Sequence, residues 1–132
     1  MPLFGRKKKE DDAPIDPEAR SPELGVKYKD LLLLGQLLQQ GADLTQPRHA
    51  LYYCYFADRD AAEHGAEQGR AGGYACEVRE PLPENAGQWS LVCERADAVL
   101  NPAGVIAADD LFEGIADRHG GEFDGWEASA RP

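Results

Sequence analysis

The segment 49–56, His-Ala-Leu-Tyr-Tyr-Cys-Tyr-Phe, has aromatic or β-prone residues at almost every position. These residue types favour a pleated strand, and both alternating sets of positions in the segment are apolar. A strand that is apolar on both sides is typical of the centre of a sheet whose two faces are covered. We therefore expect a central strand here, with other elements packed on each face.

Two helices are predicted, one before and one after this strand. Apolar residues recur at spacings of three and four over 24–38, and Ser21-Pro22 fits an N-cap followed by the first helical position. This helix is expected to end at Gly41. A weaker helix is predicted over 58–71, because its two internal glycines each cost about 1 kcal/mol relative to alanine.

The rest of the chain predicts a hairpin, a helix and a last strand. Residues 74–79 and 89–94 have strand-like patterns and are joined by a loop that contains proline and glycine, which is typical of a hairpin. A helix is predicted over 101–119, with an Asn-Pro start and a Gly-Gly stop. The final strand is predicted over 122–128.

This order of elements indicates an α+β fold. After the first helix, the order βαββαβ is that of a ferredoxin-like sandwich, and right-handed crossovers place its first and third strands at the centre. The extra N-terminal helix is a departure from that fold. We expect it to cover the sheet face that the other two helices leave open.

The charge distribution divides the chain into a leader and one domain. Residues 1–21 carry five positive and five negative charges, with Pro14, Pro17 and Pro22 in or next to the stretch, and are expected to form a flexible leader. The net charge of −10 therefore lies on the predicted domain, residues 22–132. An acidic domain repels the phosphates of RNA and DNA, so we expect no direct contact with nucleic acid.

The sequence has no pattern typical of a catalytic, cofactor or metal site. Cys54, Cys76 and Cys93 lie in three separate strand-like segments without C-x-x-C spacing, so we expect free, buried thiols. No glycine-rich phosphate loop with a Walker-type lysine is present. The basic start leads into acidic residues, and no apolar run approaches ~20 residues, so we expect a cytoplasmic, monomeric protein without a membrane partner.

The last predicted helix carries an acidic stripe that could bind a basic protein. At 100° per residue, four carboxylates lie opposite the apolar arc, with no cation among those spaced four apart. Their repulsion costs a few tenths of a kcal/mol per pair, although an ordinary solvated face is an equal alternative. The four residues are Asp109, Asp110, Glu113 and Asp117.

The final strand is a second possible contact surface. Trp126 follows Asp124-Gly125 and precedes Glu127, and aromatic residues are favoured anchors at protein interfaces. The alternative is that the tryptophan packs in the core and that Asp124-Gly125 forms a bulge or a turn.

Several of these segments resemble the regulator of ribonuclease activity B (RraB) family. The most specific is Gly-Glu-Phe-Asp-Gly-Trp-Glu at 121–127. The resemblance runs from about Leu24 to Ala128 and implies a variant ferredoxin-like fold without catalysis. It also implies a protein inhibitor that binds ribonuclease E outside its catalytic half. Weaker matches are the leucine-rich helix, Asp43-Leu44 to Pro47-Arg48, Tyr55-Phe56-Ala57-Asp58 and Gly73-Tyr74.

Two other functions stay open on the residues alone. One is an orphan member of the same family that binds another basic protein. The other is a small ligand-binding domain or enzyme with a site on the sheet, which a deep polar pocket with a histidine and a carboxylate of shifted pKa would favour. A filled core with an acidic outer helix would favour the binding module.

Overall fold

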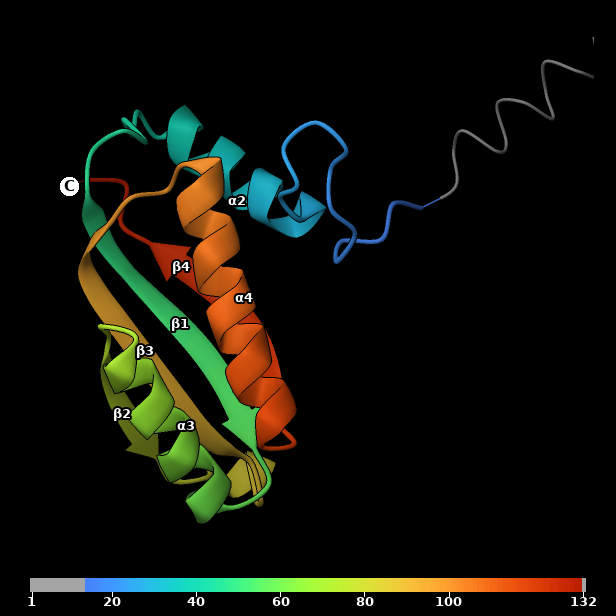
Figure 1. The fold of residues 1–132 in the computed structure, drawn as a ribbon, viewed down its shortest axis with the longest axis vertical. Coiled ribbons are helices and arrows are strands. Elements are labelled where there is room, and N and C mark those ends of the chain that lie inside the picture. The colour runs from blue at the N-terminus through green and yellow to red at the C-terminus, as the bar shows by residue number, and fades with distance from the viewer. Residues whose placement is uncertain (1–13, 132) are drawn as a thin grey trace, which may run out of the picture.

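The computed structural model describes residues 14–131, which form a four-stranded antiparallel sheet with its helices on one side (Figure 1). The sheet order is β2-β3-β1-β4, so the first and third strands are central, as predicted. The strands are β1 (Arg48–Phe56), β2 (Ala75–Arg79), β3 (Trp89–Ala98) and β4 (Glu122–Ala128). The helices are α2 (Tyr28–Gln39), α3 (Arg59–Ala71) and α4 (Pro102–Arg118), with a 3-10 turn η1 (Pro83–Asn85) between β2 and β3.

This order confirms the α+β, βαββαβ prediction with an N-terminal helix before it. The predicted hairpin is also confirmed, because β2 and β3 pair antiparallel. None of the helices within residues 14–131 has the length and apolar character needed to cross a bilayer.

Side-chain caps set the starts of the two helices that cover the sheet. The Asp58 carboxylate accepts a hydrogen bond of 2.8 Å from the backbone N–H of Ala61, which begins α3. The Asn101 side chain accepts one of 2.7 Å from Gly104 N–H, and Pro102 occupies the first turn of α4. Both caps satisfy backbone donors that the first helical turn leaves free.

The predicted start of the N-terminal helix is wrong, because α2 begins only at Tyr28. Before it, Gly25 has a φ of 72°, which a right-handed helix excludes, and Arg20 forms a β-bridge with Lys27. The Gly25 N–H donates to the Ser21 carbonyl at 2.8 Å. These hydrogen bonds fold residues 20–27 into a tight loop. The Ser21-Pro22 pair is compatible with a loop as well as with a helix start, so it did not distinguish the two.

Part of the predicted leader is described. Glu18 pairs with Lys29 at 2.8 Å, and Arg20 lies 3.1 Å from Asp110 on α4. Residues 1–13 lie outside the described residues. The division into a leader at 1–21 and a domain at 22–132 therefore stays a prediction.

Within residues 14–131 the sheet is covered on one face only, contrary to the prediction of a doubly covered β1. One set of β1 side chains, including Tyr52 and Phe56, is buried, whereas the alternate set is half-buried or exposed. Tyr52 stacks on Phe112 of α4 with ring centroids 4.8 Å apart. Tyrosine and leucine are stable on a half-exposed sheet surface, which is why composition did not distinguish the two faces.

The N-terminal helix does not cover the second face, contrary to our expectation. It lies on the side of α4, where Leu34 and Leu37 are buried (Figure 1). Trp126 of β4 is the strand partner of Tyr52, so its side chain lies on the helix-covered face of the sheet. Because Trp126 is hydrogen-bonded to Asp30 of α2, this helix lies on the same side.

Trp126 is a core residue. Its side chain is 6% exposed, and its indole Nε1 donates a hydrogen bond of 2.9 Å to Asp30 Oδ1. The prediction of a bulge before it is confirmed: the register shifts between Tyr53 and Cys54, and Gly125 has a φ of 105°. This strand pairs antiparallel with β1.

A second carboxyl group, Asp109 of α4, lies beside Asp30, and each residue is 1% exposed. Neither Asp109 oxygen has a hydrogen-bond donor among residues 14–131. A proton shared between the carboxyl groups of Asp109 and Asp30 would give both groups a hydrogen bond. Burial, followed by the hydrogen bond and charge of Asp30, raises the pKa of Asp109 to about 8. The charges of Lys27 and Lys29 oppose this shift.

Trp126→Ala should lower the free energy of unfolding by about 3–5 kcal/mol, because it empties a packed aromatic site. Trp126→Phe fills most of that volume but leaves Asp30 without its donor, and should cost less, about 1–3 kcal/mol. Urea denaturation measures both values. An unchanged stability of the alanine variant would refute the core position of Trp126.

Asp109→Asn should remove a pH dependence of stability. In the folded protein the pKa of Asp109 is about 8 against an ordinary 3.8, so the folded state binds the proton more tightly than the unfolded state. The free energy of unfolding contributed by this group therefore falls as pH rises from about 4 to 8. Denaturation at pH 5 and pH 8 should show a smaller decline in the variant. Asp117→Asn, which changes an exposed residue of the same helix, is the control and should keep the wild-type decline; equal declines in all three proteins would contradict the shared proton.

Candidate protein-interaction surface

The sheet face opposite the helices carries tyrosine, aliphatic and acidic side chains. The register places Tyr53 between Val92 and Gly125, and Tyr55 between Ser90 and Glu122. We call this surface the open face. Its principal residues are His49, Leu51, Tyr53 and Tyr55 of β1, Glu77 and Arg79 of β2, Val92 and Glu94 of β3, and Glu122, Asp124 and Glu127 of β4.

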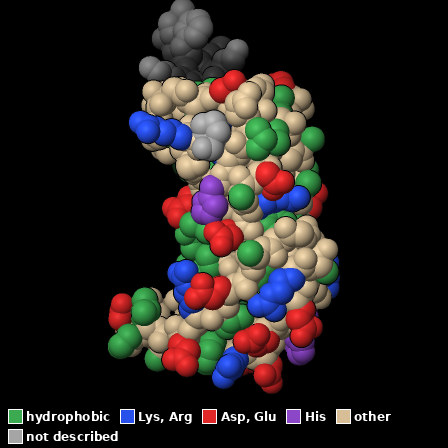
Figure 2. Space-filling model, turned by 90° about the vertical axis from the view of Figure 1, so that its left-hand side faces the viewer, with side chains coloured by type: hydrophobic (Ala, Val, Ile, Leu, Met, Phe, Trp, Pro, Cys, Tyr) green, Lys and Arg blue, Asp and Glu red, His purple; other side chains and the backbone are tan. Residues whose placement is uncertain are grey.

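The β1 side chains form an apolar row with acidic residues on both sides. Leu51 lies between Glu94 of β3 and Glu127 of β4 in the sheet register. Tyr53 and Tyr55 are half-buried, so their rings keep an accessible surface. Figure 2 shows this face in profile along its left-hand edge, where hydrophobic, acidic and basic side chains follow one another.

The tyrosines lie beside carboxylates, and Tyr53 is hydrogen-bonded to one of them. The Tyr53 hydroxyl donates to Glu127 Oε1 at 2.6 Å, and this bond, with burial, raises the pKa of Tyr53 to about 12. Burial and the neighbouring Asp124 carboxylate also raise the pKa of Tyr55. Both phenols therefore stay neutral at physiological pH and present fixed aromatic rings beside negative charges.

The open face has an excess of negative charge. It holds five carboxylates against a single guanidinium, Arg79, which lies 3.5 Å from Glu77. His49 Nε2 lies 2.7 Å from Glu94 Oε2. Within residues 14–131, no ion pair neutralises Glu122, Asp124 or Glu127. The β4 side of this face is therefore the side with unpaired negative charge.

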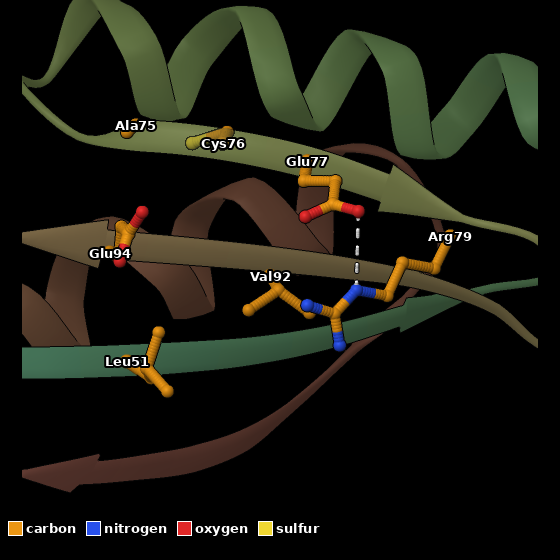
Figure 3. A pocket seen from close by; sticks show the side chains of 7 residues that line it. All are labelled: Leu51, Ala75, Cys76, Glu77, Arg79, Val92 and Glu94. Atoms are coloured by element: carbon orange, nitrogen blue, oxygen red, sulfur yellow. Dashed lines mark ion pairs between the residues drawn. The ribbon is translucent and has the colours of Figure 1, made fainter.

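A shallow hollow of about 160 Å³ lies over β2 and β3 on this face. Figure 3 shows the Arg79 side chain extending across β3 beside Val92 and pairing with Glu77. The hollow is below the ~300 Å³ at which small-molecule sites begin, and no histidine lines it. Its dimensions suit one side chain of a protein partner.

The predicted acidic stripe of α4 is only partly present on the surface, because one of its four carboxylates is buried. Asp109 is buried against Asp30, so its assignment to an exposed arc is wrong. The helical wheel placed Asp109 opposite the apolar arc, because it carried no information on α2, whose Asp30 lies beside it.

Cations from the segment before α2 cover two more residues of that stripe. Arg20 lies 3.1 Å from Asp110, and the Lys27 ammonium pairs with Glu113. No cation lies among the stripe residues along the helix, but Arg20 and Lys27 reach two of them from a distant segment. Asp117 is exposed and forms no ion pair among the described residues.

Comparison with protein families identifies the chain. The family model described as regulator of ribonuclease activity B matches residues 30–128, which include all four strands and both helices that cover them. The chain belongs to this family. No curated protein matches it. Members of the RraB family are regulatory inhibitors of ribonuclease activity and not enzymes.

The RraB fold separates the predicted contact residues into two groups. Asp124 and Glu127 lie on the open face beside the tyrosines, whereas Trp126 lies in the core. Sequence reasoning missed Tyr53 and Tyr55 as surface residues. Both tyrosines are an even number of positions from the polar His49 and therefore lie on the same face of the strand as that residue. This alternation could have indicated their exposure, but almost all other residues of the strand are apolar.

Proposed function

We propose that this RraB-family protein is a non-catalytic inhibitor of ribonuclease E and that it binds that enzyme through the open face. Family membership supports the regulation of a ribonuclease. The observation that carries the choice of surface is the row of half-buried tyrosines beside carboxylates that have no cation partner among the described residues.

An arginine-rich segment is the partner chemistry that this face fits best. A guanidinium can bind a carboxylate through two parallel hydrogen bonds and can stack on an aromatic ring. The open face offers both groups side by side, Glu127 being bonded to Tyr53 and Asp124 lying next to Tyr55. The resemblance to the family suggests that ribonuclease E presents such basic segments outside its catalytic half.

Inhibition would operate through protein contact and not through RNA. The chain has a net charge of −10, and the open face, with histidine neutral, has four more negative than positive charges. Such a surface repels a polyanion and attracts a polycation over distances up to the ~8 Å screening length of physiological solution.

The α4 surface is the less suitable contact. To bind a basic partner there, Asp110 and Glu113 would have to give up Arg20 and Lys27, and Lys27 is itself 3% exposed. Removing a buried cation from its partner carries a large penalty. We therefore place recognition on β1 and β4, in a monomeric protein acting in the cytoplasm.

Neutralising the open face should slow association with the non-catalytic half of ribonuclease E. The variant combines Glu122→Gln, Asp124→Asn and Glu127→Gln, and its matched control combines Asp110→Asn, Glu113→Gln and Asp117→Asn on α4, with an equal change in charge. Surface plasmon resonance at several salt concentrations should show an association rate reduced by roughly tenfold and a flatter salt dependence for the open-face variant alone. Circular dichroism checks that both variants are folded.

Two outcomes would redirect the proposal. Loss of binding in the α4 variant with normal binding in the open-face variant would place the contact on α4. If wild-type protein failed to bind ribonuclease E and instead bound another arginine-rich protein, the chain would be an orphan member of its family with a different target.

A further inference from the structure

Cys76 and Cys93 are cross-strand partners on the helix-covered side of the sheet. The register of β2 and β3 sets them directly opposite each other. Opposite residues in an antiparallel pair have Cα atoms about 4.5–5.5 Å apart, within the ~4.4–6.8 Å that a disulfide spans. Linking them would therefore need rotation of side chains and little movement of the backbone.

The two sulfur atoms converge beneath one point of α3. A Cβ atom added at Gly69 would lie 2.5 Å from Cys76 Sγ and 3.1 Å from Cys93 Sγ. The helix can pass over this pair because it has no side chain there. Gly69 has a low helix propensity and so destabilises α3, but its lack of a side chain leaves room for the two thiols beneath the helix.

The environments of the two thiols differ. Cys93 is fully buried, and its hydrogen bond with Cys76 together with burial raises the pKa of its thiol. Cys76 is half-buried on the edge strand; the hydrogen bond from Cys93 and the charge of Arg70 lower the pKa of its thiol. Arg70 is held nearby, since its Nη2 donates to the Cys76 carbonyl at 2.9 Å. Thiolate character and access make Cys76 the attacking sulfur and Cys93 the resolving one.

We propose that Cys76 and Cys93 are a modification site, a dithiol that a peroxide oxidises reversibly to a disulfide. The Cys76 thiolate attacks one peroxide oxygen, the O–O bond breaks, and the leaving hydroxide takes up a proton to become water. The Cys93 sulfur then attacks the Cys76 sulfenic acid, the S–O bond breaks, and a second water leaves with the Cys93 proton. Each sulfur loses one electron and the peroxide gains two; a thiol reductant reverses the step.

The third cysteine is a built-in control. Cys54 on β1 is 1% exposed, and burial raises the pKa of its thiol to about 12. It should therefore react with neither peroxide nor alkylating agent in the folded protein. The disulfide would join the edge strand β2 to β3 beneath Glu77 and Arg79, and its formation does not depend on the proposed partner.

The test treats the folded full chain with hydrogen peroxide, blocks remaining thiols after denaturation, and maps peptides by mass spectrometry without reductant. We expect a loss of two hydrogens from the intact mass, a Cys76–Cys93 cross-link, one alkylated cysteine at Cys54, and return to three alkylated cysteines after dithiothreitol. Cys54→Ser should form the same link. In Cys93→Ser, dimedone should instead trap a sulfenic acid on Cys76.

The wild-type peptide map decides the matter even if a serine variant fails to fold. Three alkylatable cysteines after peroxide treatment, a link that involves Cys54, or a link between two molecules would each overturn the proposal.

Discussion

A buried hydrogen bond from Trp126 Nε1 to Asp30 Oδ1 joins the last strand of the sheet to the first helix. Residues 96 apart in sequence meet in this bond, and Asp109 of α4 is buried beside Asp30, whose proximity helps to raise the pKa of Asp109. A single polar cluster thus fixes β4, α2 and α4 against each other. Because its oxygens have no other donors among the described residues, the cluster depends on each of its members.

The position of α2 follows from that cluster and decides which surface is free. With α2 held on the side of α4, none of the described helices packs on the other face of the sheet. The half-buried row of Leu51, Tyr53 and Tyr55 is left there beside the carboxylates of β4. The same packing brings the Lys27 ammonium into an ion pair with Glu113, which neutralises one negative charge on α4. Recognition of a basic partner is therefore most favourable on the open face.

Local patterns were sufficient to predict the element order, the central strands and the starts of α3 and α4. Asp58 and Asn101 act as caps through neighbours three residues away, and the bulge before Trp126 depends on one adjacent glycine. The segment 121–127, on which the resemblance to the family mainly rested, is also a continuous stretch of sequence. Interactions of this kind are visible in sequence because both partners lie close together in it.

What could not be predicted depends on distant partners. Asp109 has the helical position of a surface residue, and only contact with Asp30 buries it. Two carboxylates of the acidic stripe, Asp110 and Glu113, pair with Arg20 and Lys27, which lie some ninety positions earlier in the chain. The open tyrosines share a strand with buried aromatics, so only the location of the helices distinguishes Tyr53 from Tyr52. A strand with apolar residues on both faces therefore indicates a central position in the sheet. It does not indicate whether helices cover one face of the sheet or both.

The most direct test of the central claim is an NMR titration of ¹⁵N-labelled protein with an arginine-rich segment from the non-catalytic half of ribonuclease E. If the open face is the contact surface, the largest shift changes should fall on β1 around Tyr53 and Tyr55 and on β4 around Asp124 and Glu127, with α4 little affected. Shift changes confined to α4 around Asp117, with β1 and β4 unperturbed, would contradict the account.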